Sequence, residues 1–105
     1  MAKVRLSFRA RLDLLLVLEH LSDVASSRTA RKYDTDFKHA IRRLARFPGM
    51  GSPRSHFGPE ARMVSVDPYL IFYDGGPQSE TVHVLRILHG HRNITPELIA
   101  RGREP

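Results

Sequence analysis

The stretch from residue 62 to residue 89 constrains the fold of this chain most. Three runs in it, at 62–66, 69–73 and 81–89, are rich in β-branched and aromatic side chains, which favour strands. Asp67-Pro68 separates the first two runs and Asp74-Gly-Gly-Pro77 follows the second, and both are turn-forming sequences. Strands with such short connections pair antiparallel, because parallel neighbours need a long crossover. The stretch therefore predicts a three-stranded antiparallel meander.

Two helices are expected before the meander. Residues 10–24 are rich in leucine, lack proline and glycine, and carry an apolar stripe at helical spacing. The stripe consists of Leu14, Val17, Leu18 and Leu21. Ser26 or Ser27 can cap a second helix from about Arg28 to Ala45 or Phe47, which ends at Pro48 and Gly49.

The two ends of the chain add a strand and a short helix. Residues 3–8 alternate between polar and apolar side chains, as a half-buried strand does. Residues 47–59 hold three prolines and three glycines and are expected to be a loop. Thr95-Pro96-Glu97 predicts the start of a helix to about Arg101, and the tail 101–105 is expected to fray.

These elements predict an α+β fold in one domain that spans residues 1–105. Its parts are an N-terminal strand, an α-helical hairpin packed on a small antiparallel β-sheet, and a short C-terminal helix. No cysteine is present, so disulfides and thiolate zinc sites are excluded. The N-terminus shows no signal-peptide pattern, and the longest apolar run, 12–18, is shorter than the roughly 20 residues of a membrane span. We expect a cytoplasmic protein.

The chain is strongly basic, with a net charge of +6 and a pI of about 10.5. Only Lys3, Lys32 and Lys38 are lysines, and the other basic residues are arginines. The planar donor fork of arginine matches phosphates and carboxylates, so nucleic acid or an acidic protein segment is the expected partner. A basic surface with no specific target remains the alternative.

His89 and His91 raise the question of a metal site near the end of the last strand. Zinc would need a third ligand, and none is near in the sequence, so we expect no metal and no cofactor. The favoured interpretation is a strand end with a bend at Gly90. Strand alternation predicts that Leu85 and Ile87 face the helices.

Alternation then places Arg86 on the opposite face, beside Arg62. There it either pairs with a carboxylate such as Asp67 or Asp74, or binds a partner.

Two further clusters are candidate contact surfaces. Leu12, Leu15 and Leu16 lie partly off the apolar stripe of the first helix, and they form either a wider core stripe or an exposed contact surface. Arg42, Arg43 and Arg46 fall in the last turns of the second helix. They are either a solvated helix end or a clamp on an acidic partner.

Four segments resemble the RelE/ParE superfamily of bacterial type II toxins, and its ParE branch in particular. The segments are V4-R-L-S, L44-A-R-F-P-G-M-G-S-P-R54, R62-M-V-S-V-D-P-Y-L-I-F-Y73 and V84-L-R-I-L-H-G-H-R92. The resemblance implies the toxin fold and a growth inhibitor in a hetero-oligomer with a cognate antitoxin. That antitoxin is expected to be ParD-like, with a ribbon-helix-helix domain and an acidic C-terminal segment. ParE-like members act on DNA gyrase, whereas RelE-like members cut mRNA on the ribosome.

Cleavage of RNA needs an acid, a base and cations on the phosphate. The candidates here are Arg62, Tyr73, Arg86, His89 and His91. No lysine follows Lys38, which departs from the RelE pattern and favours a gyrase inhibitor without catalytic residues.

We expect Arg62, Arg86 and Arg92 to be the polar anchors of that inhibitor. DNA would be contacted only indirectly, through antitoxin or gyrase, and no membrane contact is expected. A ribosome-dependent endonuclease and an inactive toxin relative that serves as a binding module are the alternatives.

Overall fold

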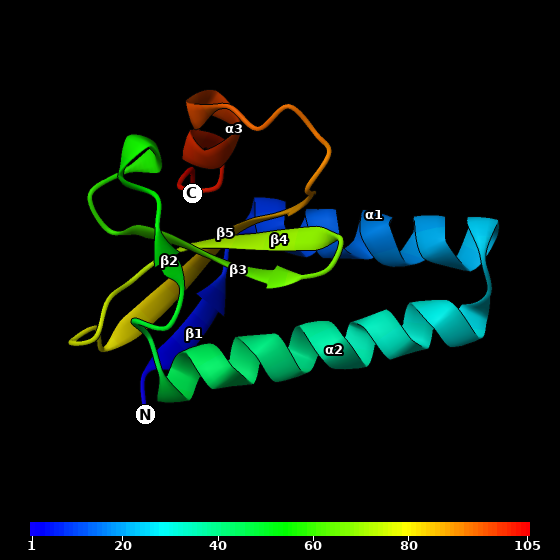
Figure 1. Ribbon diagram of the computed structural model, residues 1–105, viewed down its shortest axis with the longest axis horizontal. Helices are drawn as coiled ribbons and strands as arrows, with labels where there is room; N and C mark the ends of the chain where they lie inside the picture. Colours follow the sequence, from blue (N-terminus) through cyan, green and yellow to red (C-terminus); the bar gives the residue numbers. More distant parts are fainter.

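The computed structural model describes all 105 residues, in an α+β arrangement. Figure 1 shows a helical hairpin along one side of a sheet and a short helix on the other. The elements are β1 (Lys3–Leu6), α1 (Phe8–Val24), α2 (Ser27–Arg46), β2 (Ser52–Pro53), the 3₁₀ turn η1 (Ser55–Phe57), β3 (Ala61–Val66), β4 (Tyr69–Asp74), β5 (Thr81–His89) and α3 (Pro96–Arg101). None of the helices has the length and apolar character needed to cross a bilayer.

The five strands form one sheet in the order β1-β5-β4-β3-β2. The predicted meander is confirmed, since β3, β4 and β5 pair antiparallel. The N-terminal strand adds to β5 in parallel, so the sheet is mixed rather than wholly antiparallel. The connection between these two strands, residues 7–80, contains both long helices and the other three strands, and parallel neighbours need such a long crossover.

Apolar side chains cover both faces of the sheet. The larger core lies under the hairpin and consists of Ala10, Phe37, Leu44, Tyr69, Ile71, Tyr73, Val82, Val84 and Ile87. The smaller core lies under α3 and η1 and consists of Phe57, Ala61, Phe72, Leu85, Leu88 and Ile99. The strands β4 and β5 are therefore largely buried on both sides, whereas β3 is mostly half-buried.

A β-bulge in β5 reverses the predicted side-chain alternation. Arg86 pairs with Phe72 and Val84 pairs with Tyr73, which leaves Leu85 as the extra residue. Leu85 consequently packs under α3, while Ile87 packs under the hairpin. The prediction that both face the hairpin is wrong, because one extra residue shifts the alternation by one position.

Hydroxyl caps set the starts of the three helices. The side chain of Ser7 accepts a hydrogen bond from the Ala10 N–H at 3.0 Å, so α1 begins at Phe8. The predicted strand over residues 3–8 therefore ends at Leu6, and Phe8 is 69% exposed. Ser26 and Thr95 cap α2 and α3 as predicted.

Tyr73 and Arg62 fix the loop after α2. The Tyr73 hydroxyl donates to the Pro48 carbonyl at 2.8 Å and accepts from the Gly51 N–H at 2.9 Å. Arg62 donates to the carbonyls of Gly49, Gly51 and Gly75 at 2.8–3.1 Å. Burial raises the pKa of Tyr73, although the Gly51 N–H and Arg62 act in the opposite direction.

The C-terminal tail, which was expected to fray from Arg101 onward, is tethered as far as Arg103. The Arg103 guanidinium binds the Asp74 carboxylate at 2.7 and 2.8 Å and the Phe57 carbonyl at 2.7 Å. Gly102 is buried against the backbone of Leu85, where a Cβ would clash. These contacts hold α3 on the sheet.

Replacing Tyr73 by Phe should lower the free energy of unfolding by about 1–3 kcal/mol, because a buried N–H and a carbonyl lose their partner. Urea denaturation measures this change. Tyr33→Phe is the control, since its hydroxyl makes only a 3.3 Å bond at an exposed site and its loss should change little. Equal stabilities of Tyr73→Phe and the unsubstituted chain would contradict the proposed anchoring of the loop.

Candidate partner-binding surface

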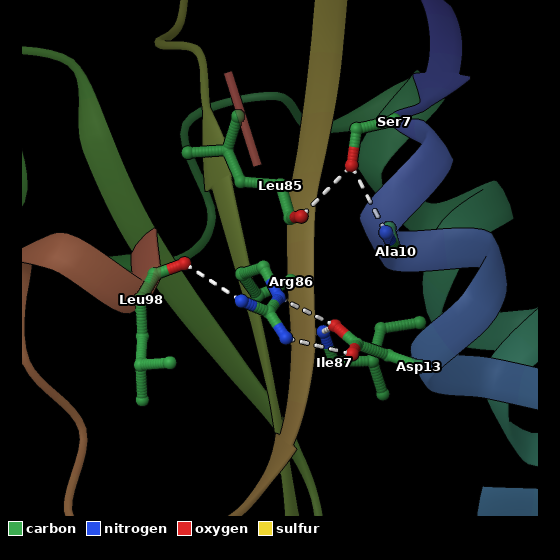
Figure 2. A network of polar contacts seen from close by, with 7 residues as sticks. All are labelled: Ser7, Ala10, Asp13, Leu85, Arg86, Ile87 and Leu98. Carbon is green, nitrogen blue, oxygen red and sulfur yellow. Dashed lines mark hydrogen bonds and ion pairs between the residues drawn. The ribbon is translucent and has the colours of Figure 1, made fainter. Parts of the chain in front are cut away.

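A buried ion pair joins α1 to the central strand. Arg86 Nε lies 2.7 Å from Asp13 Oδ2, and Arg86 Nη2 lies 2.9 Å from Asp13 Oδ1. The side chain of Arg86 is 6% exposed and that of Asp13 is 10% exposed. Arg86 Nη1 also donates to the Leu98 carbonyl at 2.9 Å, so one guanidinium links α1, β5 and α3 (Figure 2). The hydrogen bond to Asp13 raises the pKa of Arg86, although burial acts in the opposite direction.

On the β1 side of β5, side chains of α1 and its cap bind backbone groups that no strand pairs with. The strand β1 pairs only with residues 81–84 of β5. Beyond them, the Ser7 hydroxyl donates to the Leu85 carbonyl at 2.8 Å and the Asp13 carboxylate accepts the Ile87 N–H at 3.0 Å (Figure 2). Both backbone groups would otherwise be left without a partner.

Of the two alternatives for Arg86, pairing with a carboxylate is confirmed, but the acid is Asp13 rather than Asp67 or Asp74. The guanidinium is therefore not available to a partner. Arg62 does not lie beside Arg86. Arg62 shares a face with Tyr73, whereas Arg86 shares the opposite face with Phe72. The sequence held one signal for the true partner, a single acid within the apolar run of residues 12–18.

The two histidines close the end of β5. His89 Nδ1 accepts the His91 N–H at 3.0 Å, and the Gly90 N–H donates to the Pro68 carbonyl at 2.8 Å. The His89 ring also makes edge contacts with the rings of Tyr69 and His91, at centroid distances of 5.4 and 5.1 Å. This geometry agrees with the predicted bend at Gly90. No group of three His, Asp or Glu side chains is placed to hold a metal ion.

The structure does not bring the five candidate groups for RNA cleavage together. The side chains of Tyr73 and Arg62 donate hydrogen bonds to backbone carbonyls of the loop after α2. Arg86 is paired with Asp13 and lies on the other face of the sheet. His89 pairs with Tyr69, four residues along β4 from Tyr73, which corresponds to roughly 13 Å at the usual strand rise. No common point lies within hydrogen-bond reach of an acid, a base and a phosphate-binding cation in this set.

A cleft of about 590 Å³ opens between α1 and the end of β5. Buried or half-buried apolar side chains line its inner part, and more exposed basic or imidazole groups line its mouth. The inner residues include Val17, Leu21, Tyr69, Ile87 and Leu88, and those at the mouth are His20, His89 and Arg92. Burial and, to a lesser extent, Tyr33 raise the pKa of Tyr69.

The outer face of α1 is also apolar. Phe8, Leu12, Leu15 and Leu16, spaced at helical intervals, form what we call the outer stripe. Leu15 is 63% exposed and Leu16 is 53% exposed, so the wider-core alternative does not hold for them. Leu16 also lines the cleft, so the outer stripe and the cleft are continuous. Contiguous exposed apolar surface of this kind is a candidate contact surface.

The remaining predicted cations lie on the surface. Arg42, Arg43 and Arg46 are exposed near the end of α2, and Arg92 is exposed at the cleft. None of these four side chains makes a salt bridge within the chain. They are therefore free to meet an anionic partner.

Comparison with known proteins identifies the family. The sequence profile described as "ParE toxin of type II toxin-antitoxin system, parDE" matches residues 4–94. This chain belongs to the ParE toxin family. The search of curated proteins returned no relative of this ParE-family chain.

A solved structure supports the same fold. The chain superposes with a TM-score of 0.69 on a chain described as "Chromosomal ParDE TA system from P. aeruginosa". The sequence identity is 19%, and the match covers 85% of this chain and 96% of the other. The resemblance seen in the sequence is thus confirmed at the level of family and fold.

Replacing Asp13 by Ala should lower the free energy of unfolding by about 3–5 kcal/mol, because it leaves a buried guanidinium without its counter-ion. Urea denaturation of Asp13→Ala, Arg86→Met and the double variant measures the coupling. The free energy of unfolding should fall clearly less in the double variant than the sum of its decreases in the two single variants. Additive losses would show that the two side chains do not stabilise each other.

Proposed function

We propose that this ParE-family protein is a growth inhibitor that binds DNA gyrase and is neutralised by a cognate antitoxin. It would act in the cytoplasm by binding rather than by catalysis. One observation supports this choice: the fold already engages the side chains of Tyr73, Arg62 and Arg86 in hydrogen bonds and an ion pair. A catalyst of RNA cleavage would need such groups to be free and to converge on one phosphate.

The outer stripe and the cleft are the proposed seat of the antitoxin. An acidic amphipathic segment can bury its apolar side chains against Leu15, Leu16 and the inner part of the cleft. Its carboxylates then meet Arg92 and the histidines at the mouth. An apolar centre with a polar rim is the usual composition of a specific protein interface. The expected antitoxin is ParD-like, with the acidic segment at its C-terminus.

Two assays decide the target. Supercoiling by gyrase should stop in the presence of the chain, and cleaved DNA should accumulate on the enzyme. Messenger RNA on translating ribosomes should remain intact. Cleaved message with unaffected gyrase would overturn the proposal in favour of a ribosome-dependent endonuclease. Full growth on expression without antitoxin would indicate an inactive relative that serves as a binding module.

The double substitution Leu15→Glu/Leu16→Glu should weaken binding to the cognate antitoxin at least 100-fold, because buried anchors each contribute about 2 kcal/mol or more. Isothermal titration calorimetry measures the affinity. Val24→Glu is the matched control, since Val24 is 65% exposed on the same helix but lies off the outer stripe. Equal affinities of the double variant and the control would exclude the outer stripe as the seat.

A further inference from the structure

Nearly all of the net charge of this protein resides on one helix. The helix α2 contains seven basic and two acidic side chains, so it carries +5 of the total charge of +6. The other residues of the chain are close to neutral, with ten basic and nine acidic side chains. Both acids of α2 are already engaged: Asp36 pairs with Lys32 at 3.1 Å, and Asp34 pairs with Lys38 at 2.9 Å.

The basic side chains of α2 are aligned on its solvent face. Six of them recur at spacings that keep them on one side of a helix, and all six are exposed. They are Arg28, Arg31, Lys32, Arg42, Arg43 and Arg46, which we call the cationic stripe. The opposite side of α2 buries Phe37 and Leu44 completely. At 1.5 Å per residue the stripe is roughly 27 Å long.

The composition of the cationic stripe indicates the kind of partner. Thr35 and His39 fill the positions between its two halves, and no apolar side chain lies among them. A protein partner would need an apolar centre, which the outer stripe of α1 provides and α2 does not. A phosphate backbone needs only charge and donor forks, which arginines supply.

In place of the indirect contact expected from the sequence, we propose that the cationic stripe binds the phosphate backbone of duplex DNA directly and without reading sequence. The phosphates of a duplex carry one charge per roughly 1.7 Å of axis, so a rod of this length meets several of them. An α-helix also matches the width of the B-DNA major groove, about 12 Å, whereas the corresponding groove of duplex RNA is deep and narrow.

This inference deepens the proposed function and rests on it for the choice of DNA over RNA. A gyrase inhibitor meets its target on DNA, so a phosphate-binding face would add to the affinity for the gyrase–DNA complex. The proposed antitoxin seat lies on α1 and at the end of β5, and the cationic stripe lies on α2. The two surfaces therefore use different side chains.

Fluorescence anisotropy of the purified chain with a labelled duplex of arbitrary sequence tests the proposal. Affinity should be independent of sequence, and log K should fall with log salt concentration with a slope of about −5, since each phosphate contact contributes roughly −0.9. Replacing Arg42, Arg43 and Arg46 by Gln should reduce the slope by about 2.7 and weaken binding more than tenfold at low salt.

Arg5→Gln/Arg11→Gln/Arg101→Gln is the matched control, because it removes three exposed arginines from β1, α1 and α3. It should weaken binding less than threefold. Arg42→Lys/Arg43→Lys/Arg46→Lys should keep most of the affinity, and circular dichroism should show unchanged folding in every variant. An equal loss of DNA affinity in the stripe variant and in the control would mean that the total charge of the protein alone attracts DNA. This result would overturn the proposal.

Three other outcomes would also overturn the proposal. The first is no binding to duplex DNA, and the second is tighter binding to duplex RNA of equal length. The third is a stripe variant that loses affinity for an acidic antitoxin segment but not for DNA. The anisotropy assay contains no gyrase. DNA binding without inhibition of gyrase would therefore count against the proposed function alone. Inhibition without DNA binding would count against the cationic stripe alone.

Discussion

The ion pair between Asp13 and Arg86 is the interaction on which the arrangement of this molecule depends. It fixes α1 against β5, and through the Leu98 carbonyl it also fixes α3. A buried pair contributes little net stability compared with apolar packing, because desolvation offsets its Coulomb energy. Its importance is positional. The same carboxylate binds the Ile87 N–H and so completes a sheet edge that β1 leaves open.

Two groups of arginines in this chain have different roles. Arg62, Arg86 and Arg103 donate to backbone carbonyls and carboxylates, where the five-donor fork satisfies several acceptors at once. The arginines of α2 have no such partners and face solvent. The first group holds loops and helices on the sheet. The second group gives the protein its net charge, and with it the capacity to meet a polyanion.

The distribution of polar and apolar side chains bears on the choice between catalysis and binding. The face of the sheet under α3 is filled by a small apolar core that includes Phe57, Phe72 and Ile99. Of the polar groups considered for RNA cleavage, Tyr73, Arg62 and Arg86 are hydrogen-bonded within the fold. The exposed apolar residues are instead on the outer stripe of α1, beside the cleft. A surface with that distribution suits recognition of other macromolecules.

The sequence by itself determined the elements and their order, because helix caps, turns and apolar periodicity act over a few residues. Ser26, Thr95 and the Asp67-Pro68 turn behave as local chemistry predicts. It also contained the spacing of the α2 arginines. The tertiary structure decided the bulge at Leu85, the parallel pairing of β1 and the burial of Arg86 against Asp13. The last two join segments more than 70 residues apart, and the bulge depends on the register of β5 against β4. Rules that act over a few residues specify neither.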